Sequence, residues 1–108
     1  VRTQAIQDAT RFAIEVPFKV MQLCYDGMEL IREMAEKGNP NSVSDAGVGA
    51  LCARSAVMGA FMNVRINAAG YNDKGFVSDI VSKGIMIEER VMKAEQDILG
   101  IVNEKIGL

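Results

Sequence analysis

Apolar side chains recur at helical spacing along most of the chain, and a few breaks divide this pattern into segments. The breaks lie at Pro17, at residues 38–41 and at residues 70–73, where proline, glycine and asparagine gather. They predict four helical stretches, from near the N-terminus to about residue 15, then over about 17–37, 44–69 and 73–105. Pro17 is expected either to kink the first helix or to begin the second at a first-turn position. No strand pattern is present, so we predict an all-α fold, an antiparallel helical bundle.

The stretch over 44–69 is almost free of charge. Residues 46–64 include one charged side chain, Arg54, among many small ones. These nineteen residues have the length of a membrane span, but an arginine near the bilayer centre costs about 2.5–3.5 kcal/mol, and aromatic anchors are missing from one flank. We therefore expect no membrane association. We interpret the stretch as a central, small-residue-rich helix that its neighbours cover on most sides. Gly84 is the candidate irregularity of the last stretch.

One stripe of the predicted central helix has polar ends and a small-residue middle. At 100° per residue, the stripe contains Asp45, Gly49, Cys52, Ala56, Gly59, Asn63 and Asn67. Asp45 and Asn63 are separated by about 27 Å along the helix axis, which is too far for one catalytic centre. If both contribute, they serve different sites or different ends of a long ligand. Arg54 and Arg65 share the opposite face.

Composition excludes several classes of function. Twelve Lys and Arg against fourteen Asp and Glu give a net charge of −2, so no basic surface is expected to bind nucleic acid. Histidine is absent and the two cysteines, Cys24 and Cys52, form no CxxC pair, which argues against a metal site and against a histidine-based catalytic triad. The cysteine usage and the lack of a signal peptide favour the cytoplasm. A chain of 108 residues also buries a smaller fraction of its surface than a typical domain of about 150 residues does, which is consistent with a partner or a further segment.

Each polar candidate also has a structural interpretation. Ser42 and Asp45 have the spacing of a helix capping box, although aspartate replaces the usual glutamate or glutamine. Asn63 and Asn67 can bond to neighbouring backbone, and Arg54 suits a buried or interfacial ion pair. The sequence leaves these alternatives open.

Two runs of residues resemble the signature of a known family. They are GNPNSVSDAGVGAL over 38–51 and NVRINAA over 63–69. They resemble the formiminotransferase-cyclodeaminase C-terminal domain and its monofunctional bacterial relatives, the methenyltetrahydrofolate cyclohydrolases, and the flanking helices fit the same family. Domains of this family are about twice as long and begin with a Ser-Pro-Thr-Pro-Gly-Gly-Gly-Ser type segment that is absent here. Residues 1–108 therefore resemble the C-terminal part of such a helical domain, with part of the active site on a missing N-terminal segment.

The resemblance implies a folate one-carbon enzyme that works as a homodimer or larger homo-oligomer. A cyclodeaminase converts 5-formiminotetrahydrofolate to 5,10-methenyltetrahydrofolate and ammonia, whereas a cyclohydrolase interconverts the methenyl form and 10-formyltetrahydrofolate. Either reaction needs a base and an acid, and no cofactor beyond the tetrahydrofolate substrate is expected.

The residues of this sequence that match the signature receive roles by the same resemblance. Asp45 is the candidate catalytic residue, and Asn41 and Ser44 position polar atoms of the ligand. The candidates for the pterin edge or the cyclised intermediate are Asn63 and Asn67. The candidates for binding the carboxylates of the glutamate tail are Arg54, Arg65 and Lys74, because the geometry of an arginine guanidinium matches a carboxylate. The competing hypothesis is a non-catalytic helical oligomerisation or packing element, in which the signature serves turns and close helix contacts.

Overall fold

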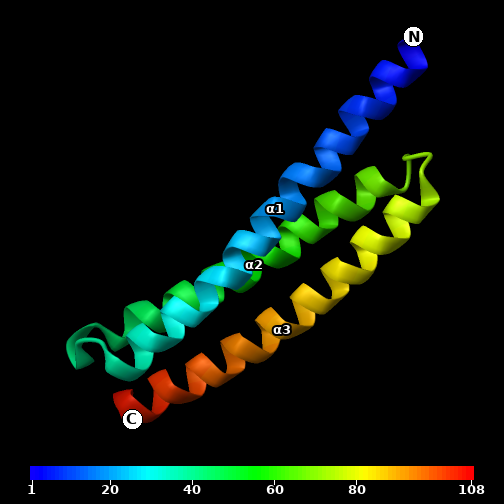
Figure 1. Ribbon diagram of the computed structural model, residues 1–108. Helices are drawn as coiled ribbons and strands as arrows, with labels where there is room; N and C mark the ends of the chain where they lie inside the picture. Colours follow the sequence, from blue (N-terminus) through cyan, green and yellow to red (C-terminus); the bar gives the residue numbers. More distant parts are fainter.

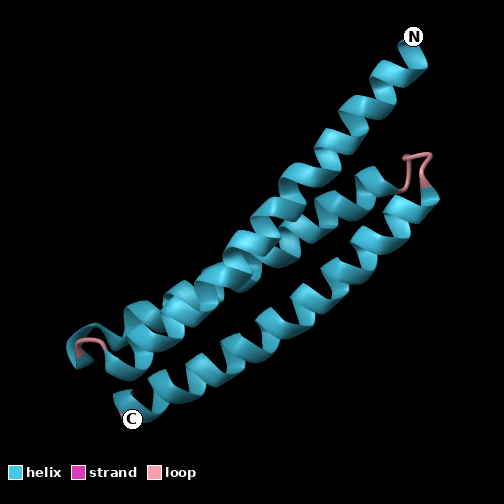
Figure 2. Cartoon of the chain, in the orientation of Figure 1, coloured by secondary structure: helices cyan, strands magenta, loops and turns pink.

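Three long helices make up nearly the whole protein. The computed structural model describes all 108 residues as α1 (Arg2–Lys37), a short 3-10 turn η1 (Pro40–Ser42), α2 (Val43–Ala68) and α3 (Lys74–Ile106). Each helix contacts the other two, and helices consecutive in sequence run in opposite directions (Figure 1). The molecule measures 60 × 19 × 18 Å and contains no strand (Figure 2). The predicted all-α class is therefore confirmed.

Pro17 lies inside α1, so the alternative in which a second helix begins at this residue is wrong and one helix continues through it. A proline within a helix removes one backbone hydrogen bond and disfavours continuation of the helix. Tertiary packing provides the compensation, because the buried residues of α1 recur every seven positions on both sides of Pro17. They are Ile14, Met21, Met28 and Ala35. A continuous helix keeps all four side chains on the face that packs against α2 and α3, which a break at Pro17 would not do.

Gly84 makes room for an aromatic ring and does not interrupt α3. The glycine is buried, and a Cβ atom built on it would lie 2.8 Å from Cδ1 of Phe61 in α2. Phe61 is 1% exposed and is the largest of the fully buried side chains. The expected irregularity at Gly84 is thus a regular helical position where two helices approach closely.

Polar contacts fasten both ends of the three helices. The side chain of Asp73 caps α3 by accepting a hydrogen bond from the Phe76 amide at 3.1 Å. Near the same end, Gln7 of α1 accepts a bond from the Asn72 amide at 2.9 Å. At the opposite end, Lys105 Nζ donates to the carbonyl oxygens of Ala35 and Glu36, close to the C-terminus of α1. These contacts satisfy groups that helix termini leave without intrahelical partners.

The helix α2 is covered on one side only, so the expectation that neighbours enclose it on most sides is wrong. Nine of its 26 residues are buried, all on the side that faces α1 and α3. The opposite side is exposed at Asp45, Val48, Cys52, Ser55, Ala56, Gly59, Met62, Asn63 and Ile66. Two neighbouring helices cannot cover a third helix on all sides. Small residues such as Gly59 bury little apolar area, so they contribute little to holding a neighbour against this side.

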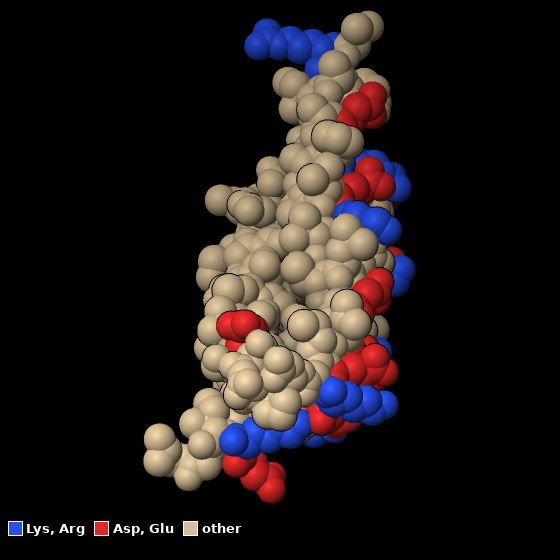
Figure 3. Space-filling model, turned by 90° about the vertical axis from the view of Figure 1, so that its left-hand side faces the viewer, with Lys and Arg blue, Asp and Glu red and all other residues tan.

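The exposed side of α2 continues onto α1. Along α1, apolar side chains with exposed fractions of 40–62% recur at spacings of four, three, seven and four residues. They are Val16, Val20, Leu23, Leu30 and Met34. We call these residues, together with the exposed residues of α2, the open face. Figure 3 shows the side on which α1 and α2 lie as a broad surface nearly free of charge, with most Lys, Arg, Asp and Glu along one edge.

By length and composition, the segment Pro40–Ala68 is long and apolar enough to cross a membrane. This is weak evidence, because the core helix of a soluble protein passes the same test. In the middle of α2, Arg54 makes an ion pair with Glu95 of α3.

Candidate functional site

The turn that connects α1 to α2 carries the first part of the signature. The side chain of Asn39 accepts a hydrogen bond from the Asn41 amide at 3.0 Å, and Pro40 begins the 3-10 turn. Ser42 is the N-cap of α2 but makes no side-chain hydrogen bond there. The capping box considered for Ser42 and Asp45 is therefore not formed, which leaves the Asp45 carboxylate free for another use.

Asp45 lies in the first turn of α2, where a negative charge complements the helix dipole. Its side chain is exposed and has neither a hydrogen bond nor an ion pair within the chain. Asn41 and Ser44, the residues predicted to position a ligand beside it, are exposed within the same turn of chain. The structure thus brings these three candidates together at one end of α2.

The other end of α2 carries Asn63 and Asn67, which differ in their contacts. The Asn67 side-chain amide donates to the Asn63 carbonyl at 2.9 Å, so the structural interpretation applies to Asn67. The Asn63 side chain has no partner and is exposed. It borders a mostly apolar groove of about 550 Å³ between α1 and α2, with Val16, Pro17 and Ala60 in its lining. Asn63 is therefore the free polar group at this end of the open face.

The three predicted cationic residues do not gather at one place. Arg54 Nη1 lies 2.9 Å from Glu95 Oε1, so the buried ion-pair interpretation describes it. Arg65 places its guanidinium 4.7 Å from the centre of the Phe61 ring, and Lys74 Nζ donates to the Tyr71 carbonyl at 2.7 Å. Arg54 and Arg65 are also separated by about 16 Å along the axis of α2. Each cation has a structural contact, and together they form no single anion-binding cluster.

Comparison with known protein families shows which group this arrangement belongs to. A family model described as formiminotransferase-cyclodeaminase matches residues 1–84. The chain belongs to this family. The match includes both signature runs and every predicted site residue, and it confirms the resemblance inferred from the sequence.

Individual relatives carry two names within the family. Methenyltetrahydrofolate cyclohydrolase from Methylorubrum extorquens is 36% identical over 107 residues, which is 97% of this chain and 47% of the relative. Formimidoyltransferase-cyclodeaminase from Rattus norvegicus is 35% identical over 75 residues, 69% of this chain and 14% of the relative. The Dictyostelium discoideum protein of the same name is 29% identical over 104 residues, 96% of this chain and 19% of that relative. This family member therefore spans less than half the length of these relatives.

Glu95 is the charged residue that sequence reasoning missed. It is 3% exposed, lies outside the matched range and has one oxygen, Oε2, without a hydrogen-bond partner. A detectable signal was its spacing, four residues after Val91 and three before Ile98, which places a carboxylate in the apolar seam of α3. The partner on α2 could not be found in this way, because Arg54 is 41 residues away in sequence.

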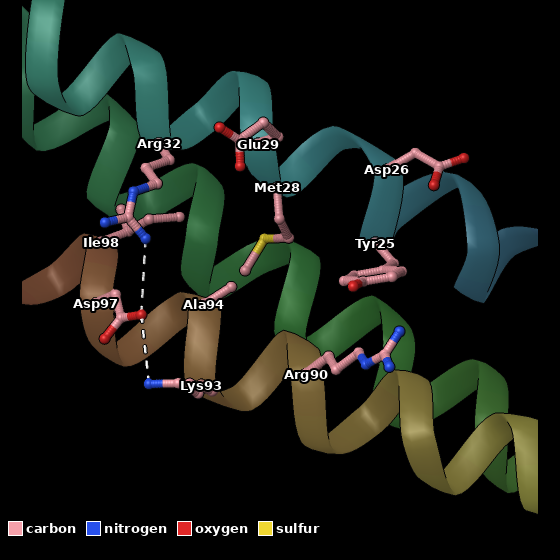
Figure 4. A pocket seen from close by; sticks show the side chains of 10 residues that line it. All are labelled: Tyr25, Asp26, Met28, Glu29, Arg32, Arg90, Lys93, Ala94, Asp97 and Ile98. Carbon is pink, nitrogen blue, oxygen red and sulfur yellow. Dashed lines mark ion pairs between the residues drawn. The ribbon is translucent and has the colours of Figure 1, made fainter.

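A second groove lies between α1 and α3, away from the signature residues. Figure 4 shows its lining, in which Arg32 and Lys93 each lie 3.7 Å from Asp97. The groove measures about 600 Å³ and also carries Asp26, Glu29 and Arg90. Charges of both signs alternate here and are largely exposed, an arrangement that suits a solvated surface. No group of three or more Cys, Asp or Glu side chains in the structure has the geometry to hold a metal ion.

Proposed function

We propose that this member of the formiminotransferase-cyclodeaminase family forms part of a folate one-carbon enzyme. Its substrate is a tetrahydrofolate carrying a one-carbon unit, either 5-formiminotetrahydrofolate or 5,10-methenyltetrahydrofolate. The supporting observation is that the two signature runs leave the polar atoms of Asp45 and Asn63 exposed and without partners on one face of α2. The names of the relatives support the same substrate class. The relative that is 36% identical over 97% of the chain is a cyclohydrolase, which favours the methenyl substrate.

Both reactions make and break bonds at a one-carbon unit attached to N5 of the folate, with proton transfers to and from the nitrogen and oxygen atoms bonded to that carbon. In cyclodeamination, N10 attacks the formimino carbon, the N10 proton is taken by a base, and the protonated nitrogen leaves as ammonia. In the cyclohydrolase direction, water adds to the methenyl carbon and loses a proton, and the bond from that carbon to N5 breaks as N5 takes a proton. With no histidine in the chain, a carboxylate is the natural local base. We assign this role to Asp45, with Asn41 and Ser44 orienting the ligand.

The rest of the site comes from outside one copy of this chain. The chain spans 47% of the cyclohydrolase relative, and Asn63 lies at the far end of α2 from Asp45. We therefore propose a homo-oligomer as the functional form, with a further N-terminal segment contributing to the site and the cytoplasm as the compartment. The open face provides the surface on which such neighbours dock.

Two assays on the full-length protein, in which this chain and its further N-terminal segment are both present, test the proposal and separate the reactions. One supplies 5,10-methenyltetrahydrofolate and follows loss of its ultraviolet absorbance, and the other supplies 5-formiminotetrahydrofolate and follows ammonia release. Asp45→Asn should lower kcat by about 10²–10⁴-fold in the active assay, because that is the usual contribution of a positioned base. Asp79→Asn is the matched control, since Asp79 is an exposed carboxylate on α3 that pairs with Lys83. Full turnover by Asp45→Asn would remove Asp45 from the catalytic role.

The alternative is a non-catalytic packing element, and the structural contacts of Arg54, Arg65 and Lys74 favour it. Thermal unfolding with and without 5-formyltetrahydrofolate distinguishes the two. A folate site raises the melting temperature in proportion to the logarithm of ligand concentration above the dissociation constant. An unchanged melting temperature together with no turnover in either assay supports the packing element.

A further inference from the structure

The signature turn between α1 and α2, residues 38–42, is held by few contacts of its own. Within it, the Ser42 amide donates to the Asn39 carbonyl at 2.9 Å, and the Asn41 amide donates to the Asn39 side chain at 3.0 Å. These bonds join residues two or three positions apart, and residues 38–42 are exposed. They shape the turn but do not fix its place in the protein. The position of Asp45, in the first turn of α2, therefore depends on what holds the two helices that flank the turn.

The last turns of α3 contact both of these helices, and the C-terminal end of α3 lies beside the turn in Figure 1. On α2, Gly47 lies so close to Val102 that an added Cβ would be 3.2 Å from its Cγ1. On α1, Lys105 Nζ donates to the carbonyl oxygens of Ala35 and Glu36 at 2.6 Å and 2.5 Å. Val102 and Lys105 are three residues apart, so they share one face of α3. One short segment of α3 thus holds the end of α1 and the start of α2.

The sequence of the turn leaves the last carbonyl groups of α1 short of amide partners. The helix ends at Lys37, and Gly38 adopts an extended conformation with a ψ of −179°, so helical hydrogen bonding does not continue. In a longer helix, the Glu36 carbonyl would accept from the amide of residue 40, but Pro40 has no amide hydrogen. The Lys105 ammonium has three donors and supplies the missing bonds. Its positive charge also complements the negative end of the α1 dipole.

Asp45 lies on the opposite side of α2 from this contact. Residues two positions apart in a helix point about 200° apart, so Gly47 faces α3 while Asp45 faces away from it. The Asp45 carboxylate makes neither a hydrogen bond nor an ion pair within the chain, so no contact of its own fixes it. Any shift of the turn therefore moves the carboxylate. A misplacement of about 1 Å can cost on the order of 10²-fold in the rate of a reaction that depends on alignment.

We propose that Lys105 is a positioning residue for Asp45. By bonding to the end of α1, with Val102 packed against Gly47, it fixes the signature turn against α3 and thereby fixes the carboxylate relative to the substrate. The proposal rests on the folate function and on the role of Asp45 proposed above. Lys105 lies beyond residues 1–84, which the family model matches, and it acts through the backbone of the turn without touching the substrate.

Steady-state kinetics of the full-length protein separate positioning from a general loss of stability. Lys105→Met removes the donors and should lower kcat by about 10-fold, because the turn is no longer tied to α3. Lys105→Arg should restore most of the lost kcat, since a guanidinium can also donate to two carbonyl groups. The control Ile87→Val removes a buried methylene group from the middle of α3, away from the turn, and should keep the parent kcat. Equal losses of kcat in Lys105→Met and Ile87→Val, or no rescue by arginine, overturn the proposal.

A double variant tests whether Lys105 acts through Asp45. In an Asp45→Asn background, Lys105→Met should change the residual kcat by less than about two-fold, because the group that it positions is already gone. A further fall of about 10-fold would show that the two residues act independently, and it would overturn the positioning role.

Amide hydrogen exchange tests the tie between the turn and α3 without any enzyme activity. The amides of Gly38 and Val43 are hydrogen-bonded at the two ends of the turn, and both should exchange faster in full-length Lys105→Met. The Phe76 amide, which bonds to Asp73 at the opposite end of the bundle, is the internal control and should exchange at the parent rate. Unchanged exchange at Gly38 and Val43 overturns the proposal.

The two kinds of measurement distinguish failure of this proposal from failure of the folate function. Unchanged kcat and exchange in Lys105→Met, beside a slow Asp45→Asn protein, overturn the positioning role and leave the folate function intact. No turnover by the parent protein in either assay overturns the folate function. Faster exchange of the turn in Lys105→Met would in that case still support its tie to α3.

Discussion

The ring of Phe61 in α2 packs directly against the backbone of Gly84 in α3. A Cβ atom on residue 84 would lie 2.8 Å from Cδ1 and 2.9 Å from Cζ of the ring. Real Cβ atoms essentially never approach another atom so closely. Because the ring is buried among the three helices, it cannot swing away without displacing other core side chains. The absence of a side chain at residue 84 therefore sets how closely α2 and α3 approach.

Gly84→Ala should destabilise the protein although alanine favours helix. The propensity gain is about 1 kcal/mol, whereas overpacking a dense core costs about 1–3 kcal/mol. Urea unfolding followed by circular dichroism should show a lower midpoint for Gly84→Ala. The control Gly100→Ala lies where nothing approaches an added Cβ and should raise the midpoint. Equal stabilisation by both substitutions would mean that the close approach of Phe61 is absent in solution.

Arg54→Met should be among the more damaging single substitutions in α2. It leaves the Glu95 carboxylate, which is 3% exposed, without its cationic partner. Because the Arg54 side chain is itself 34% exposed, we expect a loss of about 3 kcal/mol, the lower end for a broken buried pair.

The double variant Arg54→Met with Glu95→Met provides the control for this pair. Replacing both charges by apolar side chains removes the unpaired carboxylate, and its stability should return close to that of the parent protein. Urea unfolding midpoints of the parent protein, the single variant and the double variant at neutral pH make the comparison. A double variant as unstable as Arg54→Met alone would show that packing, and not the unpaired charge, causes the loss.

Pro17→Ala should stabilise the isolated chain. Alanine restores the backbone amide that proline lacks in the middle of α1, and a proline in a helix interior is disfavoured by about 3 kcal/mol. We expect a gain of about 1–3 kcal/mol in thermal unfolding. Amide hydrogen exchange over residues 10–20 should slow in parallel. Unchanged stability would indicate that the helix around Pro17 is adapted to the proline, for example by a fixed bend.

Lys105→Met should loosen the C-terminal end of α1. Lys105 Nζ donates to two carbonyl oxygens there, at Ala35 and Glu36, and its removal leaves them to water. Hydrogen exchange of the last α1 turn should become faster, with a stability loss of about 1 kcal/mol. Lys83→Met is the control, because Lys83 pairs only with Asp79 on the exposed side of α3. Equal effects of both substitutions would contradict a specific tie between the two helix ends.

The amino-acid sequence by itself determined the helices, the turns and the family. Helical periodicity and the breaks at residues 38–41 and 70–73 predicted α2 and α3 to within a residue or two, since these features depend on local backbone preference. The signature over 38–51 and 63–69 identified the family, which the match to residues 1–84 confirmed. The prediction from local sequence failed at Pro17. Proline disfavours continuation of a helix, but the burial of apolar side chains before and after Pro17 outweighs this preference.

Only the tertiary structure decided which faces are covered and which charges are paired. The ion pair between Arg54 and Glu95 joins residues 41 positions apart, and the contact of Phe61 with Gly84 joins residues 23 positions apart. No local sequence pattern links either pair. The same holds for the open side of α2, because its small residues fit a buried core and an exposed docking surface equally well. Periodicity in the sequence indicates that a helix has an apolar face, whereas the number and size of neighbouring helices decide whether that face contacts protein or water.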